Sequence, residues 1–270
     1  RRRRRILLAG VFHDIMKNNT SFRGKRMLKP VDENFKKYCV TKDGSYLKKI
    51  RSIGGGSAAL TAAGFLIAGI CVLLIAATKD VVTAEGLTLF AAVAAGSALL
   101  AIIGIFMRRR RIRTYLEYFS KKSGYTPDQL KEFDREVLEP DSCYDTVSRK
   151  LAKNSAAFSW VLTEHWFKQM DHIPIRIEDM AAAFYMNGIT YKKIQYGKSI
   201  FFVLKDGTIH DVYNWQYDKE GTARIVEELR KRNPLLIPAK SVRAGEEVYN
   251  CLEQPERVAE LYRSARERRS

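Results

Sequence analysis

Two apolar stretches decide the architecture of this chain: AALTAAGFLIAGICVLLIAAT at residues 58–78 and LTLFAAVAAGSALLAIIGIFM at residues 87–107. Each has about the 20 residues that a helix needs to cross the hydrocarbon core of a bilayer. No charged residue lies between Arg51 and Lys79, and none lies between Glu85 and Arg108. A helix in a soluble core tolerates charge on its outer face, so two consecutive charge-free runs favour transmembrane helices.

Only the segment KDVVTAE at residues 79–85 joins the two stretches. This short connection predicts an antiparallel transmembrane hairpin at residues 58–107. The connection carries a single basic residue, whereas the fifteen residues on either outer side of the hairpin carry five and seven. Basic residues concentrate on the cytoplasmic side of membrane proteins. We therefore expect an integral, multi-pass membrane protein with both termini in the cytoplasm.

Small residues recur at a spacing of four in both stretches, as in the pairs Gly64/Ala68 and Ala92/Gly96. This spacing allows helix backbones to approach closely in lipid, within the hairpin, against a second copy or against another protein. Neither stretch contains an ionisable Asp, Glu, His, Lys or Arg, so the usual mark of an ion path is missing. A small channel or transporter subunit, built from several hairpins, stays as an alternative.

The net charge of +17 is concentrated next to the predicted membrane spans. Residues 1–51 hold 16 basic and 4 acidic groups, whereas residues 123–270 hold 23 of each. A nucleic-acid partner is not expected, because such a binder concentrates its charge on the folded domain. We expect residues 1–57 to form a basic cytoplasmic segment and residues 108–157 a basic, helical juxtamembrane linker. Anionic lipids of the inner leaflet would contact Lys48, Lys49, Arg51, Arg108, Arg109, Arg110, Arg111 and Arg113.

The cytoplasmic part combines helix and strand signals. Thr126, Pro127 and Gln129 form a capping-box pattern that predicts a helix start, and a further short helix is expected over residues 144–154. Asn187-Gly188 and Asp206-Gly207 are typical of type I′ hairpin turns. Strands are expected around them, followed by a helix and a tail. The expected ranges are strands 161–170, 173–177, 180–186, 189–195, 199–205 and 208–215, a helix at 218–232, and a helical basic tail at 237–270 broken at Pro255.

Antiparallel strands closed by one helix predict an α+β fold, with a partial barrel at residues 158–236 that is pleckstrin-homology-like. The motifs VLTEHWF at 161–167, IRIEDM at 175–180, KDG at 205–207 and EELRKRNP at 227–234 carry a resemblance. The chain resembles small bacterial membrane proteins with a YcxB-like or related pleckstrin-homology-like domain of unknown function. The resemblance implies a bacterial plasma membrane and supplies no catalytic residues. We expect residues 123–270, which have no net charge, to fold without the hairpin.

No constellation of residues indicates an enzyme or a cofactor site. The four cysteines are far apart and form no Cys-x-x-Cys motif, and His165 and His172 have no cysteine partner at metal-ligand spacing. We therefore expect no metal, no cofactor and no catalytic residues. The leading hypothesis is a membrane-anchored adaptor whose domain binds a membrane or cytoplasmic protein, or a second copy of itself. The alternative is a sensor of anionic lipid, with Lys192, Lys193 and Lys198 as its ligand surface.

Overall fold

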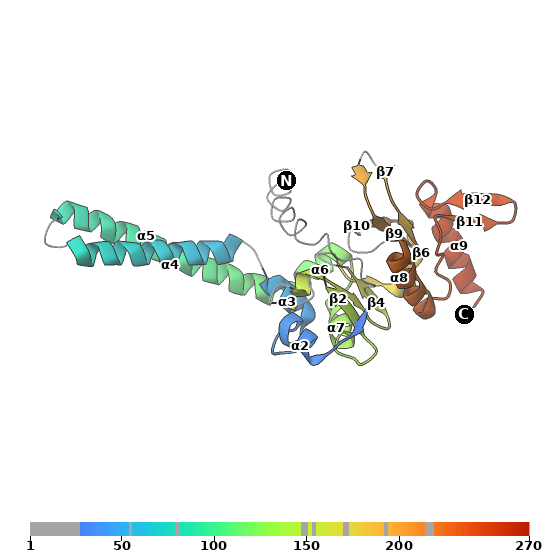
Figure 1. The fold of residues 1–270 in the computed structure, drawn as a ribbon, viewed down its shortest axis with the longest axis horizontal. Coiled ribbons are helices and arrows are strands. Elements are labelled where there is room, and N and C mark those ends of the chain that lie inside the picture. The colour runs from blue at the N-terminus through green and yellow to red at the C-terminus, as the bar shows by residue number, and fades with distance from the viewer. Residues whose placement is uncertain are drawn as a thin grey trace.

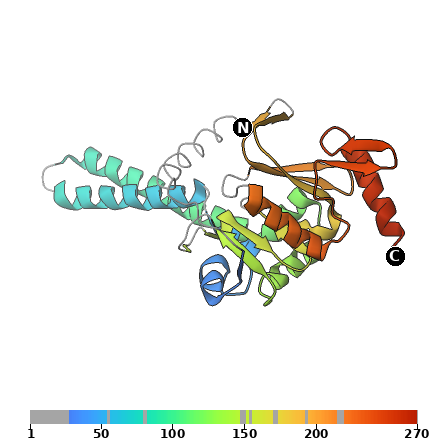
Figure 2. The same cartoon turned by 45° about the vertical axis from the view of Figure 1, so that its right-hand side comes forward.

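The computed structural model describes residues 28–53, 56–78, 82–146, 151–152, 155–169, 173–191, 194–213 and 219–269. A long helical hairpin extends from one side of a mixed helix and sheet domain (Figure 1). A second view shows the same arrangement, with the hairpin at one end and the C-terminal elements at the other (Figure 2). The expected α+β class is therefore confirmed.

The hairpin consists of α4 (Gly56–Thr78) and α5 (Ala84–Arg113). Thr83 caps α5 by accepting a hydrogen bond from the amide of Gly86 at 3.4 Å. The 30-residue α5 continues past the apolar stretch and includes the five arginines that follow it. These arginines therefore belong to the same rigid helix as the apolar residues.

Short helices from both sides of the hairpin pack around its base. The segment before it forms β1 (Lys29–Pro30), α2 (Glu33–Cys39) and α3 (Tyr46–Ser52), and the segment after it forms α6 (Tyr115–Ser123) and α7 (Pro127–Glu136). The predicted capping box is present at the start of α7, where the Thr126 amide donates to Gln129 Oε1 at 2.9 Å.

The first sheet has five antiparallel strands in the order β1, β2 (Cys143–Thr146), β3 (Ser159–Leu162), β4 (Trp166–Lys168) and β5 (Ile175–Arg176). The helix expected over residues 144–154 is wrong at its start, because Tyr144 pairs with Val161 across β2 and β3 and packs on Phe35. The single strand expected at 161–170 is two strands. Thr163 makes the turn between them, because its hydroxyl accepts from the Trp166 amide at 2.9 Å.

The second sheet has the order β10 (Ile209–Tyr213), β9 (Ser199–Leu204) and β6 (Met180–Met186). The hairpin expected between β9 and β10 forms at Asp206-Gly207, but its turn is a three-residue loop at 205–207 and not a type I′ turn, because the Leu204 amide donates to the Thr208 carbonyl at 2.8 Å. Gly207 takes a φ of 82°, and the Asp206 carboxylate accepts from the Thr208 amide. The hairpin expected at Asn187-Gly188 is wrong: β6 pairs with β9 instead. Five consecutive buried residues in each of these strands, 180–184 and 199–203, explain the pairing, because each strand is covered on both faces.

Among the described strands, β7 (Ile189–Tyr191) and β8 (Ile194–Tyr196) pair only with each other, and they form an insertion between β6 and β9. Helix α8 (Lys219–Arg232) then closes the core between the two sheets with Ile225, Val226 and Leu229, the apolar face expected from the sequence. The core that it covers includes Trp160, Leu162, Phe167, Ile175, Ile177, Met180, Ala183, Ile200 and Phe202.

The tail differs from the expected broken helix. Its first part is a hairpin of β11 (Ser241–Ala244) and β12 (Glu247–Asn250), and only its second part is a helix, α9 (Pro255–Glu267). Gly245 takes a φ of 65° in the turn, a conformation that favours glycine and reverses the chain. Val242 opposite Tyr249 then pairs the two strands.

The described parts of the expected basic segment and of the expected linker share a core with the expected β domain. A second core joins Phe35, Tyr46 and Leu47 from the N-terminal helices to Phe133 of α7 and Trp166 of β4, all fully buried. Residues 28–53 and 115–138 are therefore structural parts of the domain, because their apolar residues are buried in this shared core. The remainder of the expected 1–57 segment, residues 1–27, lies outside the described residues.

Candidate membrane interface

The outer surface of the hairpin is apolar and exposed. Leu66, Leu73 and Phe106 are 66%, 70% and 66% exposed. Within the apolar windows of α4 and α5, only 11% and 17% of the residues are buried in the protein. A core helix of a soluble protein would be mostly buried. Apolar faces as exposed as these are rare on soluble proteins and are typical of surfaces that contact a membrane or another protein. Both helices are long and apolar enough to cross a membrane.

The two helices contact each other through small residues. A Cβ atom added to Gly64 would lie 2.6 Å from the carbonyl oxygen of Ser97 and 2.9 Å from the amide nitrogen of Ala101. Gly104 likewise lies against Thr61 and against the carbonyl of Ser57. Larger side chains at either glycine would therefore force the helices apart.

The structure divides the residues expected to pack the hairpin. Gly64 lies in the contact and Ala68 is half-buried beside it, but Ala92 and Gly96 are exposed. A Cβ atom at Gly96 would meet nothing within 4 Å. Ser97 occupies the contact instead, and one residue turns a helix by about 100°. The expectation that Ala92 and Gly96 pack within the hairpin is therefore wrong, and their contact with a second copy stays a prediction.

The base of the hairpin is attached to the domain by polar and aromatic contacts. Arg111 donates from Nη2 to the carbonyl of Ile53 at 3.2 Å, which joins the end of α5 to the residue after α3. The Arg51 guanidinium lies 3.8 Å from the centre of the Tyr118 ring of α6. Burial, with the charge of Arg111, lowers the pKa of Arg51 from its usual value. The helix pair is thus anchored by α3 and α6.

A buried carboxylate fixes α3 in place. Asp134 of α7 accepts a hydrogen bond from the Ser45 hydroxyl at 2.5 Å and another from the Leu47 amide at 2.8 Å. These donors belong to the first turn of α3, where amides have no partner within the helix. Burial raises the pKa of Asp134 to about 6, although both hydrogen bonds act in the opposite direction.

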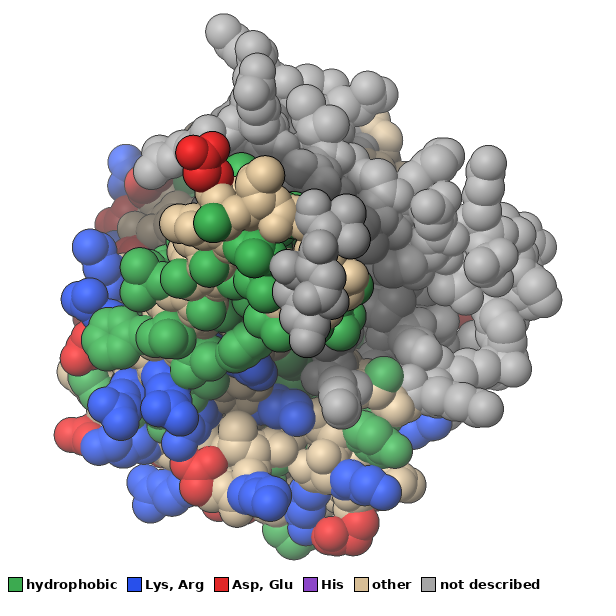
Figure 3. All heavy atoms as spheres, turned by 90° about the vertical axis from the view of Figure 1, so that its left-hand side faces the viewer, with side chains coloured by type: hydrophobic (Ala, Val, Ile, Leu, Met, Phe, Trp, Pro, Cys, Tyr) green, Lys and Arg blue, Asp and Glu red, His purple; other side chains and the backbone are tan. Residues whose placement is uncertain are grey.

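The basic residues expected at the membrane surface gather at the base of the hairpin. We call the following set the basic collar: Lys48, Lys49 and Arg51 from α3, and Arg108, Arg109, Arg110, Arg111 and Arg113 from α5. Because α3 contacts α5, the two groups lie beside each other. Viewed from the hairpin end, green apolar side chains stand next to a group of blue Lys and Arg side chains (Figure 3). Lys48 is paired with Asp43 at 2.5 Å, whereas Arg108, Arg109, Arg110 and Arg113 are exposed.

The lysines expected as a ligand surface are not part of this collar. Lys198 is exposed in the turn between β8 and β9, whereas the collar comes from α3 and α5. Lys192 and Lys193 lie outside the described residues. The structure therefore brings together the predicted lipid contacts, and the predicted ligand surface stays a prediction.

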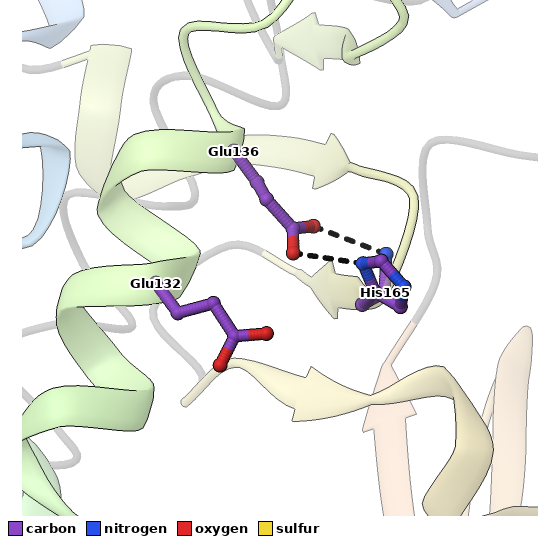
Figure 4. A group of neighbouring side chains, drawn as sticks. All are labelled: Glu132, Glu136 and His165. Carbon is purple, nitrogen blue, oxygen red and sulfur yellow. Dashed lines mark hydrogen bonds and ion pairs between the residues drawn. The ribbon is translucent and has the colours of Figure 1, made fainter.

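One cluster of metal-ligating residue types was not expected from the sequence. Glu132 and Glu136 of α7 lie with His165 such that one ligand atom from each falls within 4.8 Å of the others (Figure 4). Glu136 accepts from the Thr163 hydroxyl at 2.7 Å and from the His165 amide at 3.1 Å, and its other oxygen lies 2.9 Å from His165 Nδ1. The spacing of four between the two glutamates places both on one face of a helix, and this is the one feature of the sequence that points to the cluster.

The carboxylates of this cluster are already engaged by protein donors. Arg176 donates from Nη2 to both oxygens of Glu132, at 3.0 and 3.2 Å, and from Nη1 to Glu178. A cation would have to displace the guanidinium and compete with the donors on Glu136. The geometry therefore favours a brace that holds the β3–β4 turn against α7 over a metal centre.

The buried thiols do not resemble activated nucleophiles. Burial raises the pKa of Cys39 and of Cys251 to about 11, which disfavours the reactive thiolate.

The chain matches no family model, no curated protein and no solved structure.

Proposed function

We propose that this protein is a non-enzymatic membrane-anchored adaptor. The hairpin of α4 and α5 inserts in a bilayer, the basic collar lies at the anionic headgroups, and the remaining domain binds a protein partner. The observation that carries the proposal is the apolar outer surface of the hairpin directly above the collar. An apolar surface of this kind gains about 25 cal/mol for each Å² removed from water.

The charge of the collar supports one orientation. Each Lys or Arg near an anionic leaflet contributes about 1 kcal/mol of attraction, and the collar holds several exposed arginines. We propose that the collar and both chain ends lie on the cytoplasmic side, at a bacterial plasma membrane. The link between α4 and α5 then lies on the opposite side.

We also propose that the domain has a pleckstrin-homology-like architecture. Three features support this: the meander β2 to β5, the separate sheet β6, β9 and β10, and the closing helix α8. Domains of this shape carry many functions, so the architecture alone assigns no ligand. The lipid-sensor and channel alternatives have less support. Lys198 lies in the turn between β8 and β9, whereas the collar comes from α3 and α5. The described parts of α4 and α5 contain no ionisable group before Arg108 except Glu85 and the thiol of Cys71.

Insertion is tested first by extraction. Full-length protein is reconstituted into vesicles of phosphatidylcholine and phosphatidylglycerol and washed with alkaline carbonate, which removes proteins bound only at the surface. We expect the protein to stay in the membrane. Release into the supernatant would contradict insertion of the hairpin.

The collar is tested by retention of anionic lipid in mixed micelles. Replacing Arg108, Arg109 and Arg110 with glutamine should lower the amount of bound phosphatidylglycerol. The corresponding loss of binding free energy is at most about 3 kcal/mol in total at low salt. The matched control replaces Arg243, Arg268 and Arg269, which are exposed in the C-terminal elements, and removes the same charge. Equal losses in the two variants would mean that lipid responds to net charge and not to the collar.

A further inference from the structure

A groove of about 400 Å³ lies between α8, the end of β6 and residues 238–240. Phe184, Val226 and Pro238 are among its lining residues, and the first two are buried. This volume falls in the range of pockets that hold small ligands. The groove thus offers an apolar place for one inserted group.

The wall opposite α8 is held by the C-terminal hairpin. The Cys251 amide donates to the carbonyl of Lys240 at 2.9 Å, and the Cys251 thiol lies 3.3 Å from the carbonyl of Ala239. Ile237, which precedes residues 238–240 in the sequence, donates from its amide to the carbonyl of Ala181 on β6 at 2.9 Å. Both ends of this wall are therefore attached to the sheet or to β12, and the groove is a preformed feature.

The charges around the groove are mostly basic. Lys219, Arg230 and Lys240 surround it, with Glu227 as the one acidic lining residue. No ion pair joins any of these four to another described residue, whereas Lys231 and Arg232 on the same helix share Glu228. Exposed cations of this kind attract an anionic ligand and exclude a basic one.

The position of the groove selects among anionic ligands. Both views place α8 and the C-terminal elements in the part of the molecule away from the loop end of the hairpin (Figures 1 and 2). With the hairpin in a bilayer, headgroups of the same membrane would lie at the collar and not at this groove. Residues 1–27 carry nine basic residues and one acidic residue, so their charge does not complement the groove.

We propose that the groove binds an acidic peptide segment of a partner protein. An aromatic or aliphatic side chain of the segment lies against Phe184 and Val226, and carboxylates on either side of it pair with Arg230 and Lys240. This inference rests on the adaptor function and names the chemistry of its partner. Binding itself does not require insertion in a membrane, so the two proposals can fail separately.

The test uses full-length protein in uncharged detergent and fluorescein-labelled hexapeptides, followed by fluorescence anisotropy. The sequence DEEFED should bind, DEESED should bind at least tenfold more weakly because it lacks the apolar group, and KKKFKK should not bind. The double variant R230E/K240E should lose at least tenfold in affinity for DEEFED, and the affinity should fall as salt is raised.

The matched control is R224E/K231E, which makes the same charge change on α8 at residues that do not line the groove. It should keep its affinity within about twofold, and both variants should unfold at temperatures close to the parent. Equal losses in the two variants, equal binding of DEEFED and DEESED, or no binding of DEEFED to the parent would each overturn the proposal. If the parent protein binds DEEFED but does not insert in vesicles, only the membrane anchor is refuted.

Discussion

Substitution of Gly64 by alanine tests the contact between α4 and α5. The added methyl group would lie 2.6 Å from the carbonyl oxygen of Ser97, whereas ordinary contacts begin at 3.4 Å, so the helices must separate by most of the missing 0.8 Å. Overpacking of this kind costs about 1–3 kcal/mol. Alanine is favoured over glycine within a helix by about 0.5–1 kcal/mol. We expect a net loss of up to about 2.5 kcal/mol.

Gly96→Ala is the matched control on the partner helix. Its methyl group meets nothing within 4 Å, so only the helix preference remains and the hairpin should gain about 0.5–1 kcal/mol. The two variants carry the same chemical change and are expected to shift stability in opposite directions.

Cys71 provides a readout specific to the hairpin, because it is 6% exposed among the residues of α4. The reaction of its thiol with a maleimide dye is followed during heating in detergent, in a background with Cys39, Cys143 and Cys251 replaced by alanine. Gly64→Ala should expose Cys71 at a temperature several degrees below that of Gly96→Ala. If the two variants expose Cys71 at the same temperature, the helices do not meet at Gly64.

Three further outcomes are expected. The structure reverses the expectation that residues 123–270 fold alone: this fragment should show no cooperative unfolding by near-ultraviolet circular dichroism, because residues 28–53 supply part of its core, and addition of the missing segments should restore the transition. The raised pKa of Asp134 means that the folded protein binds a proton more tightly than the unfolded chain, so this residue's stabilising contribution is complete below about pH 4 and is lost as pH rises through about 6; Asp134→Asn should flatten that part of a chemical-denaturation pH profile. Glu136→Gln should cost about 1–3 kcal/mol and speed amide hydrogen exchange in the β3–β4 turn, whereas unchanged exchange would contradict its role as a brace.

The sequence predicted those elements whose signals are local. Charge-free length identified the two long helices, Thr126 and Gln129 predicted the start of α7, and Asp206-Gly207 predicted the turn between β9 and β10. In each case the residues on which the prediction rests are the same residues that form the helix, the cap or the turn. The gathering of the basic collar also followed from the sequence, because its two groups immediately flank the hairpin.

The failures arose where a distant partner decides the outcome. Asn187-Gly188 predicted a local hairpin, but β6 pairs with β9, and the two paired strands share two cores, one on each face of the sheet. Phe35 and Tyr46 lie in a segment that its charge marks as basic, and nothing nearby in the sequence indicates that they pack against Phe133 and Trp166. The alignment of Glu132 and Glu136 with His165 likewise depends on a turn that lies far along the chain.

The continuity of α5 has a consequence for how copies of this protein face one another. This helix runs from Ala84 to Arg113 without interruption, and Thr114 is the one residue between it and α6. The azimuth of the domain about the helix axis is therefore set by the number of residues in α5. Each residue adds about 100° of rotation, so one residue inserted after Met107 would turn the domain through more than a quarter of a circle relative to the membrane-facing half of the same helix. In two neighbouring copies, helix length would thus decide whether their grooves open toward each other or in opposite directions.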